Sequence, residues 1–110
     1  MNIITSKSNP KIKLAYKLMN DASARRGEGL FILEGLRLCC DAALSGVSIT
    51  DVFATDSALD KYSSELEKLF AASAGVYVIR EDAADRISDT KNSQGVFCVC
   101  KALDKADNID

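Results

Sequence analysis

The sequence predicts an α/β domain, a three-layer α/β/α sandwich whose central sheet has four mostly parallel strands. Two observations lead to this prediction. Along the 110 residues, short apolar runs alternate with longer segments of helical periodicity, and this alternation is typical of a largely parallel sheet that helices cover on both faces. Hydrophobic residues make up 47% of the chain and charged residues 27%, which is the composition of a globular domain that can bury its own core.

The first helix is predicted to begin at the pair Asn9-Pro10 and to extend to about residue 20. Asparagine is a favoured cap residue, and proline is favoured at the first helical position. A helical period then separates an apolar side from a lysine-bearing side. The apolar side consists of Ile12, Ala15 and Met19, and the lysine-bearing side consists of Lys13 and Lys17.

The remaining elements follow from the same periodicities. After a short helical turn and loop at residues 23–29, strands are predicted at residues 30–33, 49–54, 76–79 and 95–100, and helices at residues 36–45, 56–75 and 81–88. Gly46 and Gly75 mark the ends of two of these helices. Residues 1–102 are expected to form the domain, whereas residues 103–110 are polar, lack a hydrophobic face and are expected to begin a linker.

The four cysteines are expected to be reduced and to pack as small apolar residues. They are Cys39, Cys40, Cys98 and Cys100. Their spacing differs from the usual Cys-x-x-Cys zinc motif, and the chain has no histidine, which is the other common zinc ligand and the commonest general base. We therefore expect no metal site and no catalytic residue.

The first residues and the hydropathy of the chain favour the cytoplasm as its location. No apolar run approaches the roughly 20 residues that a membrane helix needs. The first residues also lack the basic and then apolar layout of a secretory signal.

The charge is distributed unevenly along the chain. Residues 1–40 contain seven basic and three acidic residues, a net charge of +4, whereas residues 41–110 contain seven basic and thirteen acidic residues, a net charge of −6. Lysine and arginine attract phosphate groups, and arginine can bind them through two hydrogen bonds. The candidates for contact with an anionic partner are Lys7, Lys11, Lys13, Arg25 and Arg26. A solvated helix face explains the same charges equally well, so both interpretations stay open.

A second candidate group lies where the strand at residues 30–33 ends. Glu34 follows this apolar run directly, and an unpaired charge at such a position is costly. Arg37 is close enough in sequence to neutralise it. We predict a structural ion pair between Glu34 and Arg37.

Five short sequence motifs follow one another in order over residues 3–103. They are Ile4-Thr5-Ser6 with Asn9-Pro10-Lys11-Ile12-Lys13, Arg25-Arg26, Phe31-Ile32-Leu33-Glu34-Gly35-Leu36-Arg37 with Asp41-Ala42, Ser88-Asp89-Thr90, and Gln94-Gly95-Val96. In this combination the chain resembles the amino-terminal substrate-binding domain of SpoU/TrmH-family (SPOUT class) RNA methyltransferases. Family members often have proline at the position of Ser93.

The resemblance implies a fold similar to that of ribosomal proteins that bind kink-turn RNA. It also implies an enzyme that transfers a methyl group from S-adenosylmethionine to a ribose 2′-hydroxyl of ribosomal or transfer RNA. In that family a separate carboxy-terminal domain binds the cofactor and forms the homodimer, and its motifs do not occur here. The present chain is therefore expected to carry no cofactor, to be inactive alone, and to bind RNA instead of DNA or a membrane.

Within this interpretation the five basic residues would hold phosphate groups. Asn9 and Gln94 are polar candidates for contact with a base or a ribose hydroxyl, although both residue types commonly serve as cap or turn residues. Residues 103–110 would begin the linker to the missing methyltransferase domain. The alternative is a stand-alone non-catalytic module that binds kink-turn-like RNA or another protein.

Overall fold

The computed structural model describes residues 2–103, which form five strands and six helices. The strands are β1 (Asn2–Ile4), β2 (Leu30–Glu34), β3 (Ile49–Thr55), β4 (Ser73–Ile79) and β5 (Val96–Lys101). The helices are α1 (Pro10–Asn20), α2 (Ala22–Glu28), α3 (Leu36–Leu44), α4 (Asp56–Lys61), α5 (Ser63–Ala71) and α6 (Glu81–Ile87). None of these helices is long and apolar enough to cross a membrane. The predicted linker, residues 103–110, lies outside the described residues except for Leu103.

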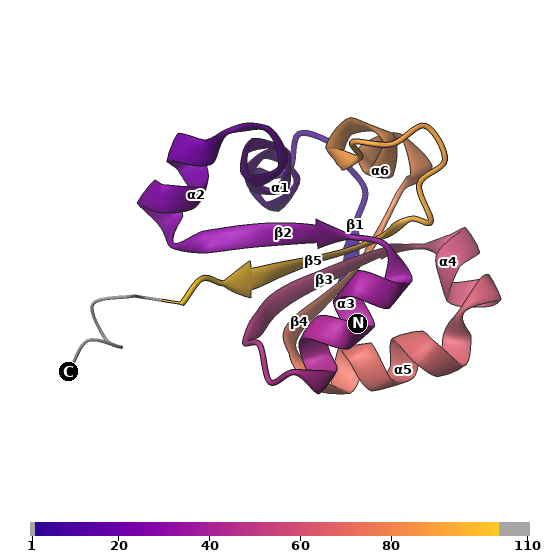
Figure 1. Ribbon diagram of the computed structural model, residues 1–110. Coiled ribbons are helices and arrows are strands. Elements are labelled where there is room, and N and C mark those ends of the chain that lie inside the picture. The colour runs from indigo at the N-terminus through magenta and orange to yellow at the C-terminus, as the bar shows by residue number, and fades with distance from the viewer. Residues whose placement is uncertain (1, 104–110) are drawn as a thin grey trace.

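The sheet lies between two layers of helices, which confirms the predicted three-layer architecture. The strand order is β1-β4-β3-β5-β2. Figure 1 shows α1, α2 and α6 on one face of the sheet and α3, α4 and α5 on the other. Because successive strand residues point to opposite faces, each face has its own core. Phe53 and Phe97 belong to the first core, and Val52, Leu66 and Cys98 belong to the second.

The sheet differs from the prediction in two respects. It has a fifth strand, β1, which pairs with β4 in parallel, and β5 runs antiparallel to both of its neighbours. β1 has three residues, of which only Ile4 is buried, so it is too short to produce a recognisable pattern. A strand that is buried on both faces has the same continuous apolar sequence whichever way it runs. The sequence of β5 therefore did not reveal its direction.

The single helix predicted for residues 56–75 is two helices followed by the beginning of a strand. Thr55 caps α4, because its side-chain oxygen accepts a hydrogen bond from the backbone N–H of Ala58. The chain leaves helical geometry at Tyr62, where φ is −124° and ψ is 34°. Gly75 lies inside β4, where a Cβ atom would be 2.9 Å from Oδ1 of Asp51. This glycine permits the close approach of Asp51 and does not end a helix.

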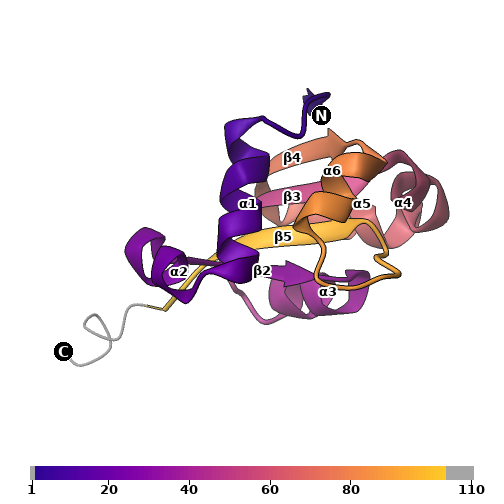
Figure 2. The ribbon, with the colours of Figure 1, turned by 90° about the horizontal axis from the view of Figure 1, so that it is seen from above.

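Helix α1 has the predicted limits and crosses the sheet. Asn9 caps it, and Pro10 is its first residue. Its buried side chains are Ile12, Ala15 and Leu18. Figure 2 shows that α1 runs from the β4 side of the sheet to the β2 side, with α2 beyond its carboxyl end. The lysine-bearing side of α1 consequently faces away from the sheet.

Three of the four cysteines are buried in the second core. Cys39, Cys98 and Cys100 have no exposed surface, and the sulfur atoms of Cys98 and Cys100 lie 3.7 Å apart. All four cysteines are free, and no group of three or more potential metal ligands occurs among residues 2–103. The hydrogen bond with Cys98 and the burial of the thiol raise the pKa of Cys100.

Thiol alkylation of the folded protein should modify at most Cys40. This residue is half-buried, and burial raises the pKa of its thiol, as do the nearby Asp41 and Glu65. Its reaction should therefore be slow at mildly alkaline pH, because the thiolate is the reactive species. Intact-mass spectrometry counts the labels, and all four thiols should react in denaturant. Modification of more than one thiol in the folded protein would contradict the buried positions of Cys39, Cys98 and Cys100.

Candidate functional site

The predicted contact residues of the amino-terminal segment differ in how free their polar groups are. Lys7 and Lys13 are exposed and have no ion-pair partner among residues 2–103. Lys11 forms an ion pair with Asp51 at 3.4 Å, and its Nζ lies 5.0 Å from the centre of the Tyr77 ring. Burial would lower the pKa of Lys11, but Asp51 and Tyr77 outweigh this effect and raise it. The charge of Lys11 is thus already partly neutralised within the domain.

Asn9 has a structural role at the beginning of α1. Its Oδ1 accepts a hydrogen bond of 2.9 Å from the backbone N–H of Lys11. The first N–H groups of a helix have no partner within the helix, so this bond satisfies one of them. The acceptor end of the Asn9 side chain is therefore occupied by the cap.

Arg25 serves the opposite end of α1. Its Nη1 donates a hydrogen bond of 2.7 Å to the backbone carbonyl of Leu18. The last carbonyls of a helix lack internal partners, and a positive charge near them is favourable. Arg26 is exposed. Of these two arginines, Arg26 is the one whose guanidinium has no hydrogen-bond partner among the described residues.

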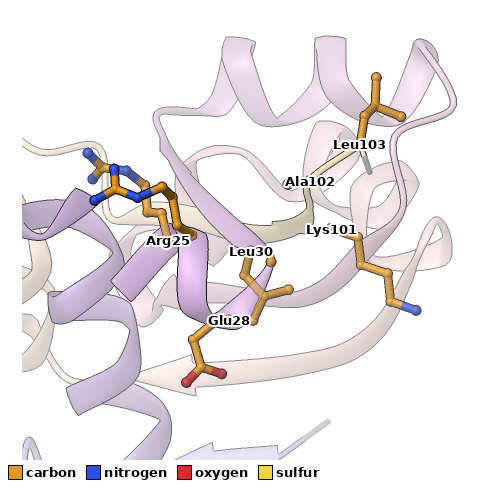
Figure 3. Close-up of a pocket in the computed structure, with 8 residues that line it drawn as sticks. Arg25, Glu28, Leu30, Lys101, Ala102 and Leu103 are labelled. Atoms are coloured by element: carbon orange, nitrogen blue, oxygen red, sulfur yellow. The ribbon is translucent and has the colours of Figure 1, made fainter. Parts of the chain in front are cut away.

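Arg25 and Arg26 line a hollow of about 700 Å³ at the end of the sheet where β2 begins and β5 ends. Figure 3 shows Arg25, Leu30, Lys101 and Leu103 around this hollow. Lys7 and Lys11 lie at the other end of α1, and a helix of 11 residues is roughly 16 Å long. The basic residues therefore form a strip along α1 and not a compact patch.

The carboxylate of Glu34 has a different partner from the one predicted. It accepts hydrogen bonds from the Ser88 hydroxyl at 2.5 Å, the Asp89 backbone N–H at 3.0 Å and the Thr90 hydroxyl at 3.3 Å. Arg37 is exposed, and no ion pair joins it to Glu34 among the described residues. The predicted Glu34–Arg37 ion pair is wrong, because hydroxyl and backbone N–H donors already satisfy the carboxylate.

Gln94 joins three segments of the chain. Its Oε1 accepts a hydrogen bond of 2.9 Å from the backbone N–H of Leu36 at the beginning of α3. Its Nε2 donates to the hydroxyl of Tyr62, between α4 and α5, at 3.3 Å. Gly35 has a φ of +106°, and a Cβ atom there would be 3.4 Å from Oε1 of Gln94. The Gln94 side chain thus fits against a turn that favours glycine in both space and backbone conformation.

Gly95 is required by its contact with Thr55. Its φ is +74°, and a Cβ atom at this position would overlap Oγ1 of Thr55. The Gly95 carbonyl accepts a hydrogen bond from the Thr55 backbone N–H at 3.0 Å. The backbones of β3 and the loop that precedes β5 can approach this closely only when residue 95 has no side chain.

These contacts bring together three of the five sequence motifs, which are far apart in the chain. Glu34 and Gly35 lie at the carboxyl end of β2, and they meet Ser88 and Gln94 at the two ends of the loop before β5. Ser88 occurs in one of these motifs without a predicted role, and Tyr62 lies within the predicted helix at residues 56–75. No local signal identified either residue as a partner, because each contact spans 32 residues or more.

Replacement of Glu34 by alanine should destabilise the domain more than replacement of Arg37. Glu34→Ala leaves the Ser88 hydroxyl and the Asp89 N–H without their acceptor, which should lower the free energy of unfolding by roughly 1–3 kcal/mol. Arg37→Ala removes an exposed side chain and should change it by less than about 0.5 kcal/mol. Urea unfolding measures both variants. A greater loss of unfolding free energy for Arg37→Ala than for Glu34→Ala would instead support an ion pair between Glu34 and Arg37.

The effect of Glu34→Ala should also depend on pH. Burial would raise the pKa of Glu34, but hydrogen bonds from Ser88, Asp89, Ser93 and Thr90 outweigh it and lower this pKa below its ordinary value of 4.5. The stabilisation is complete above the unfolded pKa and is lost as pH falls through the folded pKa. The difference between wild type and Glu34→Ala should therefore shrink on acidification below the ordinary glutamate range. A difference that grows would contradict this assignment.

Several solved structures share this fold. An rRNA methyltransferase from Sinorhizobium meliloti matches 93% of this chain with a TM-score of 0.74 and 24% identity. An RNA 2′-O ribose methyltransferase matches 94% with a TM-score of 0.76 and 23% identity. The SpoU methyltransferase AviRb from Streptomyces viridochromogenes matches 87% with a TM-score of 0.69 and 14% identity. The present chain spans only 37%, 38% and 36% of these chains, respectively.

A search of curated protein sequences finds no match. A family model does match, over residues 9–98, and it describes an MRM3-like substrate binding domain. The matched span extends from the cap of α1 into β5, and it includes the Glu34 turn and the whole loop from Ser88 to Gly95. The chain belongs to the family of MRM3-like substrate binding domains.

Proposed function

We propose that this chain is the RNA substrate-binding domain of an S-adenosylmethionine-dependent ribose 2′-O-methyltransferase that acts on ribosomal or transfer RNA. The main support is the match of residues 9–98 to the MRM3-like substrate binding domain. The shared fold adds weight, because the similar structures are RNA methyltransferases. RNA is the macromolecular partner in this proposal, and the cytoplasm is the proposed location.

In this proposal, methyl transfer belongs to a part of the protein outside the present chain. The similar structures are more than twice as long as this chain, and two of them contain bound AdoMet. A further domain would bind the cofactor, carry out the reaction and form the homodimer. The domain described here would hold the RNA.

Lys7, Lys13 and Arg26 are the strongest candidates for phosphate contact. All three are exposed, and none has an ion-pair partner among residues 2–103. Lys11 and Arg25 would contribute less, because Asp51 and the carboxyl end of α1 already engage them. Asn9 and Gln94 hold backbone N–H groups through their side-chain oxygens. We therefore assign the latter two residues to the shape of the binding surface.

Single-stranded RNA should bind this chain through α1, with a strong dependence on salt. Lys13→Ala should weaken binding and should reduce the slope of log affinity against log salt concentration by about one unit, as expected for one lost phosphate contact. Lys68→Ala is the matched control, since Lys68 is also an exposed helical lysine but lies on α5, on the opposite face of the sheet. Fluorescence anisotropy at several salt concentrations measures both variants. Equal effects of the two substitutions would contradict an RNA surface on α1.

The chain alone should neither bind S-adenosylmethionine nor methylate RNA. The reason is that the proposed cofactor domain lies outside the 110 residues. Isothermal calorimetry with the cofactor and a tritium-transfer assay with RNA test the two parts of this prediction. Binding in the micromolar range or measurable methyl transfer would show that this domain has a catalytic role.

A further inference from the structure

A polar crevice lies at the carboxyl ends of β3 and β4, apart from the basic strip on α1. Its volume is about 470 Å³, and its walls come from α4, α6 and the loop at residues 91–95. None of Lys7, Lys11, Lys13, Arg25 or Arg26 lines it. The crevice therefore requires an explanation separate from phosphate contact at α1.

The topology of the sheet explains why a crevice opens at this point. β3 and β4 are adjacent and parallel. The helix after β3 is α4, which lies on one face of the sheet, and the helix after β4 is α6, which lies on the other face (Figure 1). Two neighbouring strands whose following helices diverge in this way leave a crevice between the helices. Ligands of open α/β sheets characteristically bind there.

The groups that line the crevice both donate and accept hydrogen bonds. Two lysines and two carboxylates contribute equal numbers of positive and negative charges: Lys61, Lys91, Glu81 and Asp85. The Ser57 hydroxyl donates to Glu81 at 2.7 Å, and Asn92 adds an amide. A phosphate group would meet the two carboxylates unfavourably. A planar heterocycle and a ribose carry donors and acceptors of their own, so they fit this mixed set of partners.

One wall of the crevice is an aromatic side chain in a fixed position. The Tyr62 hydroxyl accepts a hydrogen bond from Nε2 of Gln94, and Oε1 of Gln94 accepts one from the Leu36 backbone. Unstacked RNA bases are recognised by contact with aromatic rings and by hydrogen bonds to their edges. We propose that this crevice binds one unstacked nucleoside of the RNA substrate, an inference that rests on the proposed function. Gln94 acts in it as a positioning residue for Tyr62.

Titration of the 110-residue chain with the four uncharged ribonucleosides, followed by ¹H–¹⁵N NMR, tests the proposal. At least one nucleoside should shift the backbone amides of Ser57, Tyr62 and Asn92 in a saturable manner, with a dissociation constant of roughly 1 mM or below. The amides of Lys7 and Lys13 should not shift. Inorganic phosphate should leave the crevice amides unchanged. The proposal would be overturned if no nucleoside shifted these amide signals, or if inorganic phosphate shifted them equally.

Asp85→Phe should fill the crevice from the exposed side of α6 and weaken nucleoside binding at least about tenfold. Glu67→Phe is the matched control, because it makes a similar acid-to-phenylalanine change at an exposed position of α5 that does not line the crevice. Asn92→Ala provides a second test that adds no bulk, and it should also weaken binding. Unchanged affinity in both crevice variants would refute the assignment. Nucleoside binding without any RNA binding would instead leave the crevice assignment standing and refute the proposed function.

Discussion

The arrangement of the whole domain depends on the insertion of β5 between β2 and β3. β5 is antiparallel to both neighbours, and its residues from Val96 to Cys100 are buried. A strand in this position must enter the sheet at the end where β2 and β3 finish. The chain therefore returns from α6 through a loop that lies against the carboxyl ends of those strands. This requirement places the loop before β5 next to the Glu34 turn.

Polar contacts then fix the loop in one conformation. A carboxylate that accepts hydrogen bonds from hydroxyl and backbone N–H groups is satisfied without a second charged side chain. The use of Glu34 in this manner leaves Arg37 exposed to solvent. Gln94 satisfies an N–H group at the beginning of α3, where the helix itself offers no acceptor. Hydrogen bonds consequently hold the loop at both ends, and in each of these bonds at most one partner is charged.

Most of the local structure and part of the site could be predicted from the sequence. The cap at Asn9, the limits of α1 and the alternation of strands and helices all depend on residues close together in the chain. The partner of Glu34 lies 54 residues away, and the fully buried pattern of β5 carries no information about its direction. The periodicity also did not predict that Gly75 on β4 faces Asp51 on the adjacent strand β3. Most of what the sequence did not predict is therefore long-range pairing, which only the packed sheet determines. The break between α4 and α5 at Tyr62 is a local exception.

The lengths of the strands have a consequence for how the domain behaves among other chains. The outermost strands, β1 and β2, have three and five residues, whereas the interior strands β3 and β4 have seven each. β1 covers β4 only from Tyr77 to Ile79, and the uncovered part, residues 73–76, reads Ser-Ala-Gly-Val. Short outer strands, and an open stretch rich in residues that disfavour β structure, offer a poor template for strand addition. This edge of the sheet is thereby a poor site for edge-to-edge association, although nearly half of the residues of the chain are hydrophobic.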